Sequence, residues 1–528
     1  LKSVTNSNIS AMKRRLNELK NTNDQGTNNQ DIATLEHDIL EVESNLIKNQ
    51  ISEDKNYSLL EDEKPSRSFL NMESGKGGYS NITLLRKPNP HYDCNNQGQQ
   101  MEYFHLTDGL CIRETVAYDF QKIYKSQENI KSSLQDLDDF LNSDDDTMPK
   151  THMNIRRLPD HQSRQLEGEI TEDELKSCLF KNMKGGSAPG IDGFTVAWLR
   201  QFWNELGTLT TMAINECYNN NELSQTLKTA IVKLLRKGQK DPTLSTNYRP
   251  ISLLSIHYKL ASCAITQRIK PHMSALIGSQ QKAYVNNNVI GSCLINLINM
   301  IKHVNERKLN AIILLIDFKK AFDSIDHGFI TTALKAYNFG EGMIKWINLF
   351  FNQREAYILL GGHLTSKIML EQGVPQGDVI SPYIFILMVE ILLIKINYTK
   401  NLKGIRYAKK ESRSETFADD TTVILERSEE YLRYAMKCLS DFHKLSGLQC
   451  NIDKTMVIPI GGITDPTIKI CEDINLEWAS EFKILGFFID NKLEKLHSNV
   501  ENCTRKVRAI INKWRKYNLT IMGRMTVT

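Results

Sequence analysis

Residues 416–425 read Thr416-Phe417-Ala418-Asp419-Asp420-Thr421-Thr422-Val423-Ile424-Leu425. Apolar and β-branched residues flank the two adjacent acids, which predicts a tight hairpin with both carboxylates at its tip. Neighbouring anions repel each other, so a fold accommodates them best where a cation or water neutralises them. Taken alone, the pair indicates either a divalent-metal site or a solvated turn, since turns favour Asp.

Two other stretches favour the metal site. Ala311–Ile316 is an unbroken apolar run of strand length that ends on Asp317, which predicts a buried strand with this acid at its end. A loop rich in Gly and Pro follows at residues 372–382 (QGVPQGDVISP), and a helix-like apolar segment then runs from Tyr383 to Leu393. Together these features make a workable two-metal site for phosphoryl transfer.

The three stretches resemble the signature blocks of reverse transcriptases. The forms FxKAFDSIDH (residues 318–327), GVPQGDVISPYxF (373–385) and FADDTT (417–422) are similar to those of the LINE-type, non-LTR retrotransposon branch. The resemblance extends over residues 166–528, with a weaker match before them. It implies an α+β right-hand polymerase, with fingers, a palm built on an antiparallel sheet, a partial thumb and a helical N-terminal extension.

Composition limits the function classes. The 528 residues are 41% hydrophobic and 24% charged, typical of a globular protein of two to four domains. The net charge is only +4, so a nucleic-acid surface must be a local basic patch. No apolar run reaches the ~20 residues that a membrane span needs, which predicts no membrane partner.

The termini and cysteines give further expectations. The N-terminus has no signal-peptide core, and the ten cysteines contain no C-x-x-C pair. This pattern indicates reduced thiols in an intracellular protein and argues against a zinc knuckle. The chain begins at Leu1, which suggests a fragment of a longer reading frame that lacks the endonuclease and Cys/His finger of many family members.

The first 165 residues are predicted to form a helical, polar extension and a linker. Apolar residues at 3-4 spacing between Ile32 and Leu46 indicate a docked amphipathic helix or a short coiled coil. Residues 61–73 resemble the family signature GEKPSKYFLNLE, residues 85–100 read as a loop and residues 112–130 as a helix. The six aspartates of residues 136–146 predict a solvated linker rather than a metal site, with a boundary near residues 145–165.

Residues 166–490 are predicted to hold fingers and palm. Thr171 and Glu174 form a capping box that opens a helix. A Gly/Pro-rich loop at 184–194 resembles the family's template-contacting loop, and strands at 231–236 and 247–254 resemble its finger hairpin. Arg249 matches the triphosphate-binding Arg, and Lys237 or Lys240 assists it by charge; taken alone, these cations also fit a solvated face.

A further block, residues 281–290, resembles the family pattern QxGFVxGRxI. Ala283 replaces its first Gly, and Asn287-Asn288 replace its Gly-Arg. These departures put a template or packing contact in doubt and leave the carboxylates untouched. An amphipathic helix is predicted from Leu294 to His303.

The resemblance implies the roles of the acidic residues. Asp317 and Asp419 would bridge two Mg²⁺ ions, for which Mn²⁺ is a candidate substitute, and the main-chain carbonyl of Phe318 would be a further ligand. Asp420 joins this catalytic and metal-binding group as a neighbour that tunes its charge.

Nucleotide contacts follow from the same blocks. Phe322 matches the steric gate that excludes a ribose 2′-OH, although a Phe is also often a core residue. Gln376 matches a nucleotide contact, and Gly373 and Gly377 permit a close backbone approach. Lys454, in a block similar to SGLxxNxxKT, matches a general acid for pyrophosphate, with a surface lysine as the alternative.

The C-terminal part resembles the primer-gripping hairpin and the start of a thumb. Residues 481–489 match the hairpin pattern FKYLG and are expected to be apolar core, while residues 491–528 begin the thumb. A helical tract there carries cations for phosphate contact or for an exposed face: Arg505, Lys506, Arg508, Lys513, Arg515, Lys516 and Arg524.

The predicted function is RNA-directed DNA synthesis, a nucleotidyltransferase reaction, for retrotransposition of a LINE-type element. The partners implied are an RNA template, a DNA primer or target and dNTPs, and the implied location is the nucleus and a cytoplasmic ribonucleoprotein. The main alternative is a catalytically inactive RNA-binding remnant of such an element. A two-metal nuclease would leave the matches at Phe322 and Gln376 unexplained.

Overall fold

The computed structural model describes residues 82, 84–88, 103–142, 155–238, 240–285, 290–407 and 410–514. Residues 79–499 form one compact unit. A second unit comprises residues 1–78 and 500–528, of which only 500–514 are described. The predictions for residues 1–73 and for Asn287-Asn288 lie outside the described residues, and the predicted division at residue 165 stays a prediction.

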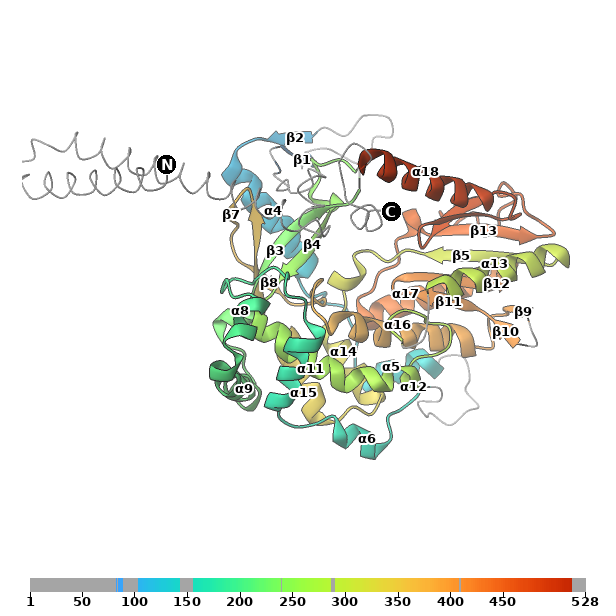
Figure 1. The fold of residues 1–528 in the computed structure, drawn as a ribbon. Helices are drawn as coiled ribbons and strands as arrows, with labels where there is room; N and C mark the ends of the chain where they lie inside the picture. Colours follow the sequence, from blue (N-terminus) through green and yellow to red (C-terminus); the bar gives the residue numbers. More distant parts are fainter. Residues whose placement is uncertain are drawn as a thin grey trace, which may run out of the picture. The chain divides into compact units, whose positions relative to one another are not determined.

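A five-stranded sheet with the order β11-β12-β5-β13-β14 organises the compact unit (Figure 1). Its strands are β11 (Ser414–Phe417), β12 (Asp420–Glu426), β5 (Asn310–Ile316), β13 (Met456–Gly461) and β14 (Glu477–Trp478). The central strand β5 confirms the predicted buried run, because Ile312, Ile313 and Leu314 have no exposed surface. It runs antiparallel to both β12 and β13, so the chain direction alternates at the centre of the sheet.

Apolar side chains cover both faces of this sheet. Ile313 packs in a cluster with α13 (Ile290–Glu306), while Ile312 and Leu314 join the larger core with α16 (Ser381–Tyr398) and α17 (Glu429–Ser446). This two-sided burial explains why β5 is apolar at successive positions rather than at alternate ones. The strand ends are therefore held firmly by the packed layers.

The predicted two-acid hairpin is confirmed. Phe417 pairs with Asp420 across the β11–β12 turn, so Ala418 and Asp419 form its tip. Thr421 pairs with Ile316 of β5, and the next step of this antiparallel register sets Asp420 opposite Asp317. The fold thus brings together acids that lie about a hundred positions apart in the chain.

A second sheet has the order β4-β3-β6-β7, with β8 also paired to β6. Its strands are β4 (Tyr248–Leu253), β3 (Thr229–Arg236), β6 (Arg354–Leu360), β7 (His363–Leu364) and β8 (Ile368–Leu370). The antiparallel pairing of β3 with β4 confirms the predicted hairpin. Arg249 lies opposite Leu235, near the loop that connects the two strands.

Helix α16 has the length and composition of a membrane-crossing helix, with a mean hydropathy of 1.5. It is nevertheless a core helix, because 78% of it is buried inside the protein. It begins at Ser381 with Pro382 in its first turn, after the Gly/Pro-rich loop, and extends beyond the predicted Tyr383–Leu393 at both ends. Pro is well placed there because the first helical turn needs no internal N–H partner.

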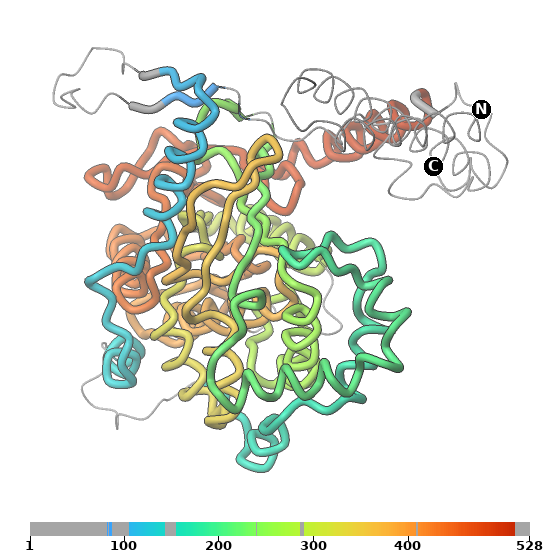
Figure 2. Tube along the Cα trace, turned by 90° about the vertical axis from the view of Figure 1, so that its left-hand side faces the viewer, coloured from blue at the N-terminus to red at the C-terminus, as the bar shows by residue number. Residues whose placement is uncertain are grey.

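The N-terminal part of the unit differs from the sequence-based expectations. Helix α4 spans Gly109–Tyr124, earlier than the predicted 112–130, and lies beside β8 (Figure 2). Residues 85–88 form strand β1 rather than loop. The predicted linker at 136–146 is wrong up to residue 142, because α5 (Leu134–Asn142) buries Leu137 and Phe140 and leaves Asp139 in solvent. An amphipathic helix can bury its apolar face while its acids stay exposed, as Asp139 does, or only partly buried, as Asp136 and Asp138 are.

Several further predictions concern the remaining elements. The Thr171–Glu174 capping box is present and opens α7, and Leu175, Cys178 and Leu179 are buried as expected. In β15–β16 the expected apolar core is only partly formed, because Phe487 and Phe488 are about half exposed (47% and 46%). The other elements are β2 (Tyr103–Leu106), α6 (Asp160–Gln165), α7 (Glu172–Ser177), η1 (Cys178–Asn182), α8 (Val196–Gln201), α9 (Trp203–Asn220), α10 (Gln225–Lys228), η2 (Ser245–Asn247), α11 (Ile256–Ile269), η3 (Lys270–His272), α12 (Met273–Leu276), η4 (Ala321–Asp323), α14 (His327–Ala336), α15 (Glu341–Phe351), β9 (Ile405–Tyr407), β10 (Lys410–Ser412), η5 (Ile452–Lys454), β15 (Glu481–Ile484), β16 (Phe487–Asp490) and α18 (His497–Trp514).

Segregated helices around two largely antiparallel sheets make this an α+β fold. The cysteines that the structure describes are all free, in agreement with the expected reduced thiols. The cations Arg505, Lys506 and Arg508 lie exposed on α18, whereas Arg515, Lys516 and Arg524 fall outside the described residues.

Candidate active site

A cleft of about 1490 Å³ lies between the two sheets. The β3–β4 hairpin supplies one wall, the ends of β5 and β12 supply the opposite wall, and the C-terminal end of α4 closes one side. Most residues predicted for the site line this cleft: Arg249, Asp317, Phe318, Phe322, Gln376, Asp419 and Lys454. Asp420 and Gly377 are next to lining residues and are not themselves part of the lining.

Asp317 is held at the end of β5 by the segment that leads into β13. The Asn451 side-chain amide donates to Asp317 Oδ2 at 2.8 Å, and the Asn451 backbone N–H donates to the Asp317 carbonyl at 2.7 Å. Lys454 Nζ lies 3.6 Å from the same Oδ2, with both side chains about half exposed (56% and 44%). Asp317 therefore keeps one carboxylate oxygen, Oδ1, without a protein hydrogen bond among the described residues.

Asp419 and Asp420 lie at the hairpin tip with their side chains open to solvent on one side. Protein on the other sides, and then the negative charge of Asp317, raise the pKa of Asp419. Desolvation, followed by the charges of Asp419 and Asp317, raises the pKa of Asp420 to about 6. The charge of Asp317 thus raises the energy of the charged form of both acids, and Asp419 adds to this effect at Asp420; a bound cation would reverse it.

These carboxylates fit a hard divalent cation. No three His, Cys, Asp or Glu side chains in the described part of the chain converge closely enough to hold a metal ion by themselves. An ion here would therefore take two carboxylates from the protein and complete its shell with water and ligand oxygens. That is the usual habit of Mg²⁺, which gives up its waters reluctantly.

The opposite wall concentrates positive charge. Partial burial lowers the pKa of Lys237, and the nearby charges of Lys454, Lys240 and Arg249 lower it further. Arg249 and Lys240 are exposed, while Lys237 Nζ donates to the Thr246 carbonyl at 3.1 Å. The three hairpin cations and Lys454, which reaches toward them from beside Asp317, repel one another, so an anion in the cleft would relieve that repulsion.

Phe322 lies in the cleft lining between the two walls. It is half-buried, and its ring stacks on Phe385 of α16 with centroids 4.4 Å apart and planes at 13°. Phe385 itself is fully buried. One face of the ring therefore packs against the core and the residue also borders the cleft, while its role as a steric gate stays a prediction.

Gln376 is oriented by an acid that sequence reasoning missed. Its Nε2 lies 3.2 and 3.1 Å from the two oxygens of Asp323, which is only 3% exposed. The Tyr124 hydroxyl, from the last residue of α4, donates to Asp323 Oδ1 at 3.2 Å. Burial raises the pKa of Asp323 to about 6 against the opposing effects of Lys320, Tyr124, Gln376 and Lys237.

Gly373 and Gly377 lie so close to neighbouring backbone segments that a side chain has no room at either position. At Gly373 (φ +82°) a Cβ would come within 2.6 Å of the Asp323 backbone, and at Gly377 (φ +119°) within 2.8 Å of the Ser252 carbonyl. Ser252 in turn donates its N–H to the Gln376 carbonyl at 2.8 Å. The loop is thus wedged between the two walls, and larger residues at these glycines would push the walls apart.

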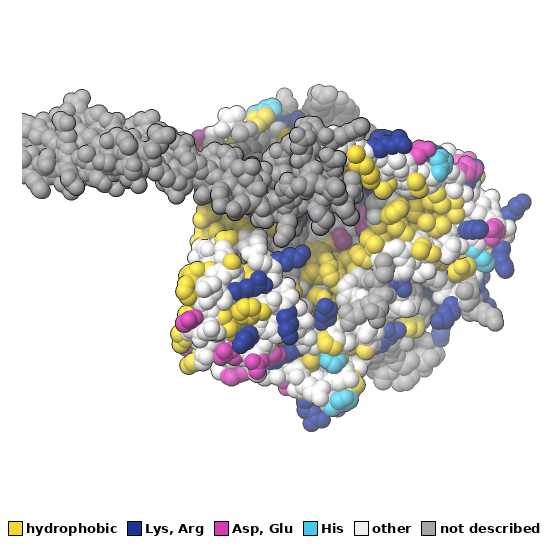
Figure 3. Space-filling model, viewed as in Figure 1, with side chains coloured by type: hydrophobic (Ala, Val, Ile, Leu, Met, Phe, Trp, Pro, Cys, Tyr) yellow, Lys and Arg dark blue, Asp and Glu magenta, His cyan; other side chains and the backbone are white. Residues whose placement is uncertain are grey.

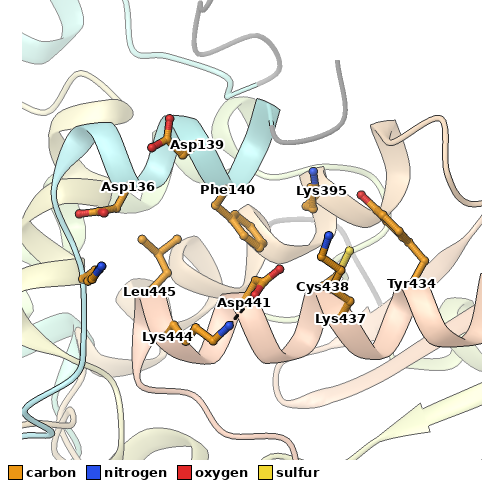
Figure 4. A pocket seen from close by; sticks show the side chains of 11 residues that line it. Asp136, Asp139, Phe140, Lys395, Tyr434, Lys437, Cys438, Asp441, Lys444 and Leu445 are labelled. Atoms are coloured by element: carbon orange, nitrogen blue, oxygen red, sulfur yellow. Dashed lines mark hydrogen bonds and ion pairs between the residues drawn. The ribbon is translucent and has the colours of Figure 1, made fainter. Parts of the chain in front are cut away.

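Another pocket, of about 240 Å³, lies where α5 meets α17 (Figure 4). It contains none of the predicted site residues. Two of its lysines have partners on the packed helices: Lys444 pairs with Asp441 at 2.9 Å, and Lys395 donates to the Leu141 carbonyl at 3.5 Å. We interpret it as the seam by which α5 packs on the core.

The surface shown in Figure 3 is unevenly charged. Lys and Arg side chains gather over the part of the molecule that holds α8 and α11, whereas apolar side chains gather over β13 and α13. This local gathering agrees with a chain whose net charge is only +4. A phosphate backbone would be attracted to such a patch without sequence preference.

Four polar residues that the sequence did not single out support the site: Tyr124, Gln281, Asp323 and Asn451. Asn451 lies within a recognised block, so its position beside Lys454 was an available signal. Asp323 likewise follows Phe322 directly. Gln281 is the first residue of the recognised block at 281–290 and Tyr124 lies in the predicted helix at 112–130, but only the fold shows which residues far along the chain they contact.

Comparison with known proteins agrees with this geometry. Residues 235–489 match the reverse transcriptase (RNA-dependent DNA polymerase) family. The chain is 25% identical over 480 residues to the transposon TX1 uncharacterized 149 kDa protein of Xenopus laevis, covering 89% of this chain and 34% of that protein. It is 26% identical over 306 residues to the retrovirus-related Pol polyprotein from the type-1 retrotransposable element R2 of Popillia japonica (57% and 41% covered).

A third relative is the RNA-directed DNA polymerase from the mobile element jockey of Drosophila funebris. It is 23% identical over 334 residues, which covers 61% of this chain and 35% of that protein. The chain therefore spans between about a third and two fifths of the length of these curated relatives.

Proposed function

Since this chain contains a reverse transcriptase domain of the LINE-type, non-LTR branch, we propose that it catalyses RNA-directed DNA synthesis. It would add deoxynucleotides to a primer 3′-OH on an RNA template and serve the retrotransposition of its element. The observation that carries the proposal is the cleft with Asp317, Asp419 and Lys454 on one wall and Arg249 and Lys237 on the other. Opposed carboxylates and cations suit a metal-bound triphosphate.

The acids would hold two Mg²⁺ ions. Asp317 and Asp419 supply carboxylate oxygens, the Phe318 carbonyl is adjacent in the lining, and Asp420 adjusts the local charge. When bound, the ions supply a lowered pKa for the primer 3′-OH and neutralisation of the triphosphate. Asn451 and Lys454 fix Asp317, so its free oxygen keeps one direction.

The opposite wall would bind and orient the nucleotide. Arg249 offers a planar guanidinium to the triphosphate, and Lys237 and Lys240 add charge. Lys454, which is close to both Asp317 and Lys237, would donate a proton to the departing pyrophosphate. Phe322 would exclude a ribose 2′-OH, and the Gln376 side chain, held by Asp323, would contact the incoming nucleotide.

A right-hand polymerase arrangement follows from these roles. The β3–β4 hairpin and the 184–194 loop would be fingers, the β11-β12-β5-β13 sheet the palm, β15–β16 a primer grip and α18 the start of a thumb. Template RNA and primer or target DNA would be the partners, and a nuclear and ribonucleoprotein location would suit them. Exposed Phe487 and Phe488 offer apolar surface for a primer strand.

Primer extension tests the proposal. The chain is incubated with a poly(rA)/oligo(dT) duplex, dTTP and Mg²⁺, beside Asp419→Ala and a matched control, Asp441→Ala, in the α5–α17 pocket away from the cleft. Extension by the parent and the control, with none by Asp419→Ala, is expected. Equal extension by all three overturns the assignment of the acids.

The same experiment weighs the alternative of an RNA-binding remnant. If the parent binds the duplex in a salt-sensitive manner and extends nothing, the binding role is favoured over polymerisation.

A further inference from the structure

The residue before Asp419 has an unfavourable backbone conformation. Ala418 has φ +58°, in the left-handed region that side chains other than Gly seldom adopt. Such a conformation persists only where surrounding contacts enforce it, and these positions often occur at functional sites. The direction in which Asp419 leaves the hairpin depends on this single turn, since Ala418 and Asp419 alone join β11 to β12.

One side chain far upstream makes those contacts. Gln281 Oε1 accepts the Ala418 N–H at 3.0 Å, and Gln281 Nε2 lies 3.5 Å from the Ala418 carbonyl oxygen. The same Oε1 also accepts the Ala283 N–H at 3.0 Å. The Gln281 amide therefore contacts both the N–H and the carbonyl of Ala418, and the Ala283 N–H of its own loop holds the amide in place.

Backbone hydrogen bonds on both sides of Gln281 also hold it next to β11. Gln281 forms a parallel bridge with Thr416 of β11. Thr416 donates its N–H to the Gln280 carbonyl, and Lys282 donates its N–H to the Thr416 carbonyl, each at 3.0 Å. The segment between α12 and α13 thus extends the sheet beyond β11 and keeps Gln281 in register with the turn.

Burial makes this contact specific to an amide. Gln281 is 0% exposed and Ala418 is 8% exposed, although Asp419 is open to solvent. Without Gln281 the Ala418 N–H would lose its partner in a place that water scarcely reaches. A side chain of equal size that merely filled space could not supply one acceptor to two N–H groups.

We propose that Gln281 is a positioning residue that locks the Ala418 turn and thereby fixes Asp419 for metal binding; the metal-binding part rests on the proposed function. The residue touches neither the cleft nor the other acids among the described contacts. Its effect passes through the backbone of one turn. The departure Ala283 from the family pattern leaves the lock intact, because Ala283 contributes its backbone N–H.

The first test needs no variant. Hydrogen exchange followed by NMR on the metal-free parent should show the Ala418 amide exchanging at least ten times more slowly than the neighbouring Asp419 amide. The lock predicts this order because only Ala418 donates to a fully buried acceptor. Exchange of Ala418 at the rate of an exposed turn overturns the proposal.

The second test uses Gln281→Met, which keeps length and removes both hydrogen-bonding atoms. Mn²⁺ affinity, measured by electron paramagnetic resonance without nucleic acid, should weaken at least five-fold, and kcat for primer extension should fall by roughly 100-fold, as for a catalytic group misplaced by about 1 Å. Gln162→Met is the control, because Gln162 hydrogen-bonds His272 (3.1 Å) and is not part of the cleft lining. Unchanged Mn²⁺ affinity and kcat in folded Gln281→Met overturn the proposal.

The third test is rescue. Adding Ala418→Gly to Gln281→Met removes the Cβ that disfavours φ +58° and should restore most of the Mn²⁺ affinity. A residue that only fills the core would gain nothing from this second change, so absence of rescue also counts against the lock. If the parent extends no primer, the proposed function fails, while amide exchange still decides whether Gln281 locks the turn.

Discussion

The two walls of the cleft contrast in how they hold their charge. The acidic wall is the end of a sheet whose central strand is buried on both faces. The basic wall is the loop end of the β3–β4 hairpin, with Arg249 and Lys240 exposed. In each wall partial burial, and then the nearby like charges, raise the pKa of Asp419 and Asp420 and lower that of Lys237.

This contrast separates two physical tasks. Coordination of a metal ion requires oxygen atoms at fixed places, which a packed sheet supplies. Neutralising a triphosphate requires nearby positive charge and tolerates longer, more exposed side chains. We therefore expect changes in the acidic wall to act mainly on kcat and changes in the basic wall to act mainly on KM for the nucleotide.

The largest effect is expected for Asp317→Asn. The amide keeps the shape and removes the charge of an acid that Asn451 and Lys454 hold at the strand end. Because metal ions supply several kcal/mol of transition-state stabilisation, kcat for primer extension should fall roughly 1000-fold. Asp453→Asn, the same change within the same cleft lining, should stay near the parent; a similar loss in both variants would indicate a general charge effect.

Arg249→Ala should be the next largest. A lost charged hydrogen bond of about 1.5–3 kcal/mol should raise the KM for dTTP by roughly 10- to 100-fold, with a smaller change in kcat. Arg249→Lys should recover part of this, since it keeps charge but not the planar fork. Steady-state kinetics beside Arg236→Ala, a neighbouring strand cation outside the cleft lining, checks this; a pure kcat effect would contradict the division of tasks.

Phe322→Ala should alter sugar selection rather than rate. Removing the ring that borders the cleft and stacks on Phe385 opens space for a 2′-OH. The ratio of kcat/KM for dTTP to that for UTP should fall by roughly 10-fold, the usual scale for steric discrimination in an apolar pocket. Single-nucleotide insertion assays measure it, and an unchanged ratio with lowered stability would assign Phe322 to the core alone.

A smaller effect is expected from Tyr124→Phe on α4. It removes one hydrogen bond to buried Asp323, worth about 1 kcal/mol, and should raise the KM for dTTP by roughly 5-fold through Gln376. Tyr118→Phe on the same helix is the control, because Tyr118 is 53% exposed. Equal KM values for the parent, Tyr124→Phe and Tyr118→Phe would show that α4 does not contribute to nucleotide binding.

The smallest effect is a pH dependence of stability at Asp323. Its pKa is raised from 3.8 to about 6 in the folded chain, so its contribution favours folding below pH 3.8 and is lost as the pH rises through about 6. The Tm of Asp323→Asn minus the Tm of the parent should therefore be larger at pH 8 than at pH 5. Thermal melting at both values tests this, and an identical difference at each pH would mean that Asp323 titrates normally.

Local patterns predicted the elements of the site well. The apolar run before Asp317 and the β-branched flanks of Asp419 specify strands because burial and backbone preference act within a few residues. The acidic segment at 136–142 misled the sequence analysis for the opposite reason. Its charge density suggested a linker, but Leu137 and Phe140 share the inner face of α5 while Asp139 faces water.

What the sequence determined by itself is the set of chemical groups: the acids, the cationic hairpin, Phe322 and the Gly-rich loop. The tertiary structure alone decided which neutral and buried side chains orient these chemical groups. Gln281 reaches Ala418 across 137 positions, and Tyr124 reaches Asp323 across 199. A polar side chain looks the same in a sequence whether water or a buried partner will satisfy it, because its hydrogen bonds are chosen only when distant segments pack.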